Sequence, residues 1–154
     1  MTNEIFKRIL VPFDGSKYSQ NALGQAINIA KKAGTQIFII TAVDPSGFPL
    51  GMLLKPGSKF EKSIKVYITE VKLQVRKKLL AEVNACKAKG VSEAYYDVII
   101  GNPVDSILKF MNETKIDLII IASQGKHGIG KLKTLGSVSR KVAELATCPV
   151  MIIH

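Results

Sequence analysis

Short apolar runs alternate along the chain with longer segments in which apolar residues recur every three or four positions. The first run centres on Ile9–Val11 within Phe6–Phe13, and the second is the β-branched segment Gln36–Val43. Three further runs follow at Ala94–Ile100, Asp117–Ala122 and Pro149–Ile153. We expect each run to form a strand, and the unbroken run Leu118–Ala122 is typical of a strand buried on both faces.

The segments between these runs predict four helices. The first spans about Ser16–Ala33, with Ser16 as its N-cap and Gly34 as its stop. The others are expected at about Lys59–Lys89, from Pro103 to near Lys115, and at about Gly136–Ala146. The long second helix carries one apolar stripe that we expect to face the core: Phe60, Ile64, Ile68, Val71, Val75, Leu79, Val83 and Cys86.

Alternation of strands and helices is typical of an α/β fold with a parallel sheet. A chain of 154 residues that is 47% hydrophobic suffices for one domain with a sizeable core. Its longest apolar run is far shorter than the roughly 20 residues that a membrane span requires. The segment Met1–Arg8 has no signal-peptide core. We therefore expect a single cytoplasmic domain over residues 1–154 that does not enter a membrane.

Lysine and arginine outnumber the acids by 22 to 12, and the net charge of +10 favours anionic partners. The lysines of the long helix, with Arg76–Lys78 in their middle, could bind nucleic acid. We interpret them instead as a solvated face, because we expect no exposed aromatic residues between them for base stacking. Nucleic acid is therefore not the expected partner. We interpret Cys86 and Cys148 as core packing.

The segment after the fourth expected strand combines glycines with cations. Gly125, Gly128 and Gly130 allow tight turns and a close approach of backbone N–H groups to a ligand. Gly136-Ser137 opens the last expected helix and adds its positively polarised end. Between Ser123 and Lys141 there are five cations and no acid. A polyphosphate site beyond the carboxyl ends of the strands explains this concentration, and a solvated loop is the alternative.

Asp14 is the acid in the loop that follows the first expected strand. A carboxylate opposite phosphates needs a cation between them, and magnesium held by one carboxylate and phosphate oxygens would supply it. The same residue suits a turn or a backbone cap, because Asp14-Gly15 is a good turn pair. Both interpretations stay open at this point.

Catalytic machinery is not evident in the sequence. Gly125–Leu132 matches the P-loop pattern G-x-x-x-x-G-K, but Leu132 stands where a Ser or Thr should ligate magnesium. His127 lies among glycines without an acidic neighbour, so it suits a phosphate donor better than a general base. No nucleophile, triad or metal-ligand spacing emerges.

Taken in order, several segments resemble the universal stress protein family: Ile9–Ser16, Asp44, Gly101-Asn102-Pro103, Asp117–Ser123, Gly136-Ser137-Val138 and Cys148-Pro149-Val150. The resemblance covers essentially the whole chain. It implies a Rossmann-like sheet of five parallel strands between helices, in the order 3-2-1-4-5, as in the adenine nucleotide alpha hydrolases. It also implies a homodimer joined through the last strand, residues 149–153, and a role in stress response or signalling.

The nucleotide-binding branch of that family binds ATP or AMP, with slow ATP hydrolysis at most. Its signature is G-x-x-G, nine residues, then G-S or G-T, whereas this chain has Ala122-Ser123-Gln124-Gly125, ten residues, then Gly136-Ser137. The alanine adds one methyl group, and the longer loop could reshape the phosphate cradle.

The resemblance also implies roles for single residues. Val43 would contact adenine through its backbone, and Asp14, which with Pro12 matches the first loop, would lie near the ribose or a magnesium ion. The residues expected to hold phosphates are Gly125, Lys126, His127, Gly128, Gly136 and Ser137, with Val138 and Ser139 adjacent. A second hypothesis is a dimeric interaction module of the same fold without nucleotide, since part of the family lacks the glycine signature.

Overall fold

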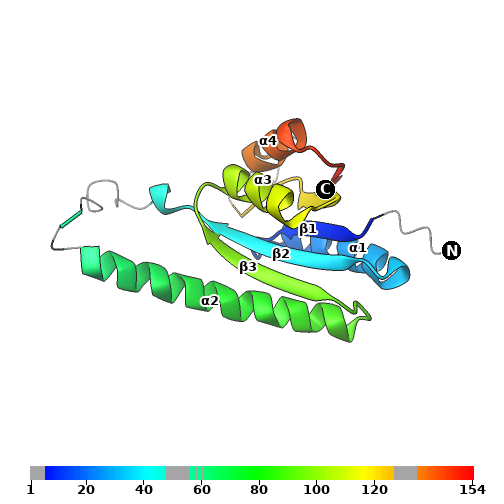
Figure 1. The fold of residues 1–154 in the computed structure, drawn as a ribbon, viewed down its shortest axis with the longest axis horizontal. Helices are drawn as coiled ribbons and strands as arrows, with labels where there is room; N and C mark the ends of the chain where they lie inside the picture. Colours follow the sequence, from blue (N-terminus) through cyan, green and yellow to red (C-terminus); the bar gives the residue numbers. More distant parts are fainter. Residues whose placement is uncertain (1–5, 48–55, 58, 60, 127–134) are drawn as a thin grey trace.

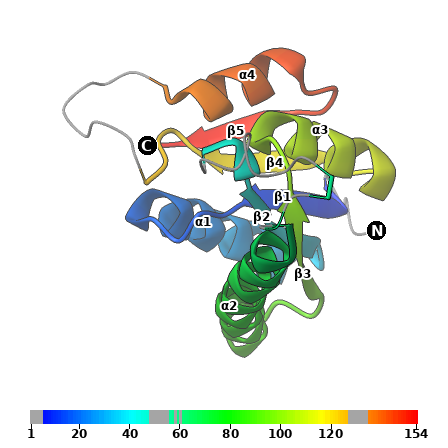
Figure 2. The ribbon, with the colours of Figure 1, turned by 90° about the vertical axis from the view of Figure 1, so that its left-hand side faces the viewer.

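The computed structural model describes residues 6–47, 56–57, 59, 61–126 and 135–154. Five strands form one parallel sheet: β1 (Arg8–Pro12), β2 (Gln36–Val43), β3 (Ala94–Ile100), β4 (Leu118–Ala122) and β5 (Val150–Ile153). Their spatial order is β3-β2-β1-β4-β5, which Figure 2 shows in full and Figure 1 shows from β3 to β1. The α/β class and the strand order expected from the sequence are confirmed.

Helices cover both faces of the sheet (Figure 2). On one face lie α1 (Lys17–Ala33) and α2 (Glu61–Ala88), and on the other α3 (Pro103–Thr114) and α4 (Ser137–Leu145). A short 3₁₀ turn, η1 (Pro45–Gly47), follows β2. Within the described residues, no helix is both long and apolar enough to span a membrane.

Side chains of each central strand alternate between two hydrophobic cores. Ile9 and Val11 of β1 pack under α1 and α2, whereas Leu10 between them packs under α3 and α4. In β4, likewise, Ile119 joins the second core and Ile120 the first. This two-sided burial explains why the central strands read as unbroken apolar runs in the sequence.

The helix boundaries follow from local capping. Helix α1 begins after Ser16, whose hydroxyl accepts a first-turn N–H, and ends at Gly34, whose φ of 68° favours glycine. Helix α3 begins at Pro103, after Asn102 has accepted two first-turn N–H groups through its side chain. The predicted caps Ser16 and Gly34 and the start at Pro103 are confirmed.

Helix α2 departs from its prediction in two respects. Four residues of the expected stripe are buried: Ile64, Leu79, Val83 and Cys86. Three others are only half-buried: Ile68, Val71 and Val75. Phe60 lies outside the described residues. Tyr67 is 45% exposed, so the expectation that no exposed aromatic residue lies among the lysines is wrong.

The two cysteines differ in environment. Cys86 is fully buried in the first core, as expected from the sequence. Cys148 is half-buried against the second core. Both thiols are free.

Candidate functional site

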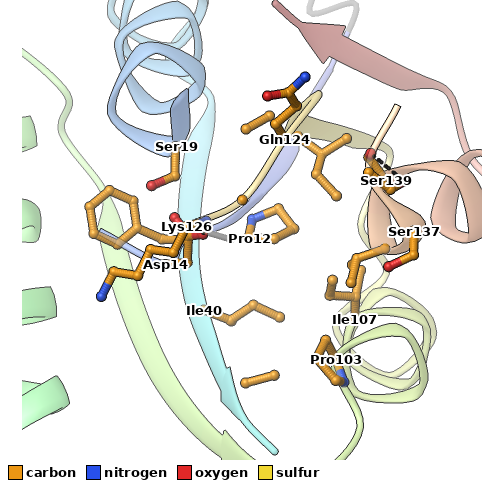
Figure 3. Close-up of a pocket in the computed structure, with 17 residues that line it drawn as sticks. Pro12, Asp14, Ser19, Ile40, Pro103, Ile107, Gln124, Lys126, Ser137 and Ser139 are labelled. Atoms are coloured by element: carbon orange, nitrogen blue, oxygen red, sulfur yellow. Dashed lines mark hydrogen bonds between the residues drawn. The ribbon is translucent and has the colours of Figure 1, made fainter. Parts of the chain in front are cut away.

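A cavity of about 440 Å³ lies at the carboxyl ends of β1, β2 and β4 (Figure 3). Here the strand order switches direction, because β2 lies on one side of β1 and β4 on the other. The first turns of α1, α3 and α4 reach it through Ser19, Pro103 and Ser137 respectively. Parallel α/β sheets bind ligands at this switch point, because loops from both halves of the sheet meet there. The cavity is therefore the candidate site.

The Asp14 side chain connects the two loops that border the cavity. Its Oδ1 accepts the backbone N–H of Ser16 at 2.9 Å, and its Oδ2 accepts the backbone N–H of Lys126 at 2.8 Å. Burial pushes the pKa of this carboxyl upward, but hydrogen bonds involving Ser16, Lys126 and Ser19 outweigh burial and leave the pKa below its ordinary value. Asp14 is therefore ionised at neutral pH and joins β1 to the loop after β4.

Glycine is favoured where that loop passes Asp14. A Cβ added to Gly125 would lie 3.0 Å from Asp14 Oδ2, which is tighter than nine in ten real Cβ contacts. Gly15 follows Asp14 and has a φ of 80°, a backbone conformation that favours glycine in the turn between β1 and α1. Both glycines therefore serve the close approach of the two loops.

The two ends of the glycine loop are joined through Ser123. The Ser123 carbonyl accepts the Gly136 N–H at 2.7 Å and the Ser139 hydroxyl at 3.0 Å. A Cβ on Gly136 would meet the same carbonyl at 3.3 Å, so this contact also favours glycine. The longer spacing between Gly125 and Gly136 is thus compatible with a closed loop base.

One side of the cavity is suited to an anion. The first turns of α1 and α4 contain no acid, and both helix starts present partly positive N–H groups there. Lys126 adds a cation, and the Ser137 hydroxyl points from the neighbouring helix (Figure 3). The Ser19 hydroxyl donates instead to the Ser16 carbonyl at 3.0 Å. The exception is the ionised Asp14, whose two oxygens each accept an N–H group.

The other side of the cavity is apolar. It is lined by Ile40, Ala42, Pro103, Ile107, Ile121 and Val138. An apolar wall beside a row of N–H donors suits a ligand with a flat hydrophobic part and an anionic part.

Strand alternation decides which residue at the end of β2 faces the site. The Ile40 carbonyl points to β1, where it accepts the Phe13 N–H at 2.8 Å, and the Val43 carbonyl points to β3, where it accepts the Gly101 N–H at 2.9 Å. The N–H and C=O groups of one strand residue point to the same side, and successive residues alternate sides, so the polar groups of Ala42 point toward β1. The last β1–β2 pair is Pro12 with Ile40, which leaves Ala42 beyond the end of β1.

Most of the predicted site residues within the described chain meet at this cavity: Pro12, Asp14, Ala122, Gly125, Lys126, Gly136, Ser137, Val138 and Ser139. Two do not line it. Ser123 is buried, and its carbonyl accepts the hydrogen bonds at the loop base. The carbonyl of Val43 points to β3, and Ala42 lines the cavity instead. His127 and Gly128 lie outside the described residues.

Sequence reasoning missed eight lining residues: Phe13, Ser19, Ile40, Ala42, Pro103, Ile107, Ile121 and Gln124. Pro103 had a usable signal, because a helix start directly after a parallel strand lies at the same edge as the other strand ends. The apolar residues had none, since their pattern is that of ordinary core.

Among the described residues that line the cavity, Asp14 is the one acidic side chain that could bind a metal ion. No group of three His, Cys, Asp or Glu side chains occurs among the residues that the structure describes. Each Asp14 oxygen already accepts one N–H, so the carboxylate can offer only a remaining lone pair to a cation. Such a site fits magnesium only if phosphate oxygens and water supply the other ligands.

A doubly wound parallel sheet with a cavity at its switch point defines this chain as a Rossmann-like α/β protein. Residues 5–154 match the model of the universal stress protein family. The chain is 31% identical over 149 residues to universal stress protein MJ0531 of Methanocaldococcus jannaschii, covering 97% of this chain and 82% of that protein. The chain belongs to the universal stress protein family.

Solved structures show the same fold. The universal stress protein UspA from Lactobacillus plantarum superposes with a TM-score of 0.83 at 21% identity, covering 97% of this chain and 98% of that one. A universal stress protein crystallised in complex with cAMP superposes with a TM-score of 0.69 at 25% identity, with 97% of each chain covered.

Proposed function

We propose that this protein binds an adenine nucleotide in the cavity at the carboxyl ends of β1, β2 and β4. The observation that carries the proposal is the division of one cavity into an apolar wall and a side lined by helix N-termini and glycine backbone. A nucleotide has a flat base and an anionic tail that match this division. The family relative in complex with cAMP supports the choice of an adenine nucleotide.

The base would lie against the end of β2. Ala42 extends beyond β1, and its N–H and C=O groups face the side on which the cavity lies. One donor and one acceptor of the same residue, on one edge of the strand, can read the edge of adenine. We assign to Ala42 the backbone contact that sequence resemblance assigned to Val43.

The phosphates would lie between Gly125-Lys126 and the start of α4 at Gly136-Ser137. His127 and Gly128 are proposed phosphate donors in the same loop, on sequence grounds. A magnesium ion, if bound, would sit between Asp14 and the phosphates and neutralise part of their charge. The acid, Asp14, is ionised and occupied by N–H groups, so it is a poor general base and we expect hydrolysis to be slow at most.

We further propose that the protein forms a homodimer through β5 in the cytoplasm and signals stress through its bound nucleotide. β5 is an edge strand that pairs with β4 alone among the described strands, and its Met151 is 38% exposed. Unpaired edges of this kind favour pairing with another chain.

Calorimetric titration of nucleotide-stripped protein with ATP, AMP and cAMP, with and without magnesium, tests the proposal. We expect saturable binding of at least one nucleotide, and loss of about tenfold or more in affinity for Gly125→Ala, whose new methyl meets Asp14. Gly24→Ala is the matched control, because a Cβ there meets nothing within 4 Å. A folded protein that binds none of the three would refute the proposal and favour the interaction module without nucleotide.

A further inference from the structure

Helix α2 extends well past the strand that supports it. Its 28 residues span about 42 Å, whereas the seven residues of β3 span about 23 Å. Figure 1 shows the N-terminal part of α2 projecting beyond the sheet. No residue between Ile64 and Leu79 is buried, although the segment is rich in apolar side chains.

Three large aliphatic side chains form a row on the outside of α2. Val66, Leu73 and Leu80 follow one another at seven-residue spacing and are 60%, 52% and 46% exposed. Residues seven apart lie on nearly the same side of a helix, two turns apart. We call these three residues the outer apolar row. The row is about 21 Å long, which equals about four turns of a partner helix.

The charged residues around the outer apolar row are mostly cationic. Between Glu61 and Leu80 there are six lysines and arginines and two glutamates. The first of these glutamates, Glu61, forms an ion pair with Lys65 at 2.9 Å. The second is Glu70. A shallow groove along the helix is lined by Lys62, Lys65, Val66, Thr69, Glu70 and Leu73, so the apolar and the cationic side chains share one surface.

We propose that the outer apolar row and its flanking lysines form a docking surface for an acidic amphipathic helix of a partner protein. Leucines of such a helix would pack on Val66, Leu73 and Leu80, and its acidic edges would pair with Lys62 and Lys65, which line the groove beside Val66 and Leu73. A second copy of α2 fits poorly, because it would place lysine against lysine along the whole contact. The surface lies on α2, apart from the nucleotide cavity, and the inference does not rest on the proposed function.

The probe for this proposal is a designed helical peptide of about 21 residues with leucine at heptad positions a and d and glutamate at e and g. The comparison probe replaces every glutamate with lysine. Fluorescence anisotropy with the full-length protein measures both. We expect the glutamate peptide to bind at least about tenfold more tightly than the lysine peptide.

Two variants separate this surface from generic charge attraction. Val66→Ser/Leu73→Ser removes exposed side chains outside the core, so circular dichroism should show an unchanged fold, and we expect affinity for the glutamate peptide to fall by about tenfold or more. Leu145→Ser on α4 is the matched control, since that leucine is equally exposed at 58% and lies on the opposite face of the sheet.

Unchanged peptide affinity in the double variant, or equal affinity for the two peptides, would overturn the proposal. Vesicles with about 30% phosphatidylserine and a single-stranded oligonucleotide complete the test. If either binds in a manner that depends on Val66 and Leu73 while the peptide does not, the occupant is a membrane or a nucleic acid, and the proposed partner is wrong.

Discussion

The carboxylate of Asp14 accepts the backbone N–H of Lys126 at 2.8 Å, although 112 positions separate the two residues in the chain. This bond holds the loop after β4 against the loop after β1, and residues of both loops line the cavity. The same carboxylate accepts the Ser16 N–H at the start of α1. One side chain thus sets the position of three segments that meet at the site.

Asp14→Asn should make the protein less stable at neutral pH and bind nucleotide more weakly. An asparagine has one acceptor oxygen, so its amide group would face a second N–H donor. Hydrogen bonds to charged groups contribute about 1.5–3 kcal/mol, and half-exposure of this site favours the lower end. Chemical denaturation and calorimetry measure the two effects, with exposed Glu144→Gln as control.

The pH dependence of stability distinguishes this bond from packing. The pKa of Asp14 is lower in the folded protein than its ordinary value of 3.8, so its stabilisation is complete above pH 3.8 and is lost as the pH falls through the folded pKa. Wild-type protein should therefore lose more stability below pH 4 than Asp14→Asn does. Parallel acid-stability curves for the two proteins would contradict this role.

Ser139 and Ser137 should separate stability from binding. Ser139 is buried and donates its hydroxyl hydrogen bond at the loop base, to the Ser123 carbonyl at 3.0 Å, so Ser139→Ala should cost about 1 kcal/mol. Ser137 is exposed at the cavity, so Ser137→Ala should leave the free energy of unfolding unchanged and weaken nucleotide binding. Equal melting temperatures for the two variants would count against the loop-base contact.

The two thiols should react at different rates. Burial is the main cause that raises the pKa of Cys86 to about 11, with a smaller contribution from Glu82, so its thiolate is scarce at neutral pH as well as inaccessible. Cys148 is half-buried, and burial followed by Asp117 raises its pKa. With a thiol reagent, Cys148→Ser should abolish the faster phase, and Cys86→Ser should leave it intact. Faster labelling of Cys86 would show that α2 opens in the native protein.

Met151→Lys tests the proposed dimer. Charged residues on an edge strand oppose pairing with another chain, so the variant should be monomeric where the wild type is dimeric. Analytical ultracentrifugation at micromolar concentration gives the mass directly. Lys141→Glu on α4 is an exposed charge-changing control, and a monomeric wild type would contradict the dimer itself.

Local signals in the sequence determined much of the fold. The run Gln36–Val43 is the observed β2 without change, and Ser16, Gly34 and Pro103 bound their helices as expected. These features depend on sterics and hydrogen bonds within a few residues, which the order of residues specifies directly. The glycines and cations after β4 also pointed to the strand end at which the candidate cavity lies, because parallel strands bring their carboxyl ends to one edge.

Tertiary structure alone decided how the site is assembled. Strand pairing turns the Val43 carbonyl toward β3, where it accepts the Gly101 N–H, and leaves Ala42 at the cavity. The register and the alternation of successive residues set this outcome. The bond between Asp14 and Lys126 requires two distant strands to lie side by side in the sheet before it can form. The exposure of Leu73 likewise depends on where β3 ends beneath α2. Apolar residues at the same helical spacing can form either a buried stripe or an exposed one, so the sequence pattern does not distinguish them. Local patterning carries no information on these distances, and only the packed fold supplies it.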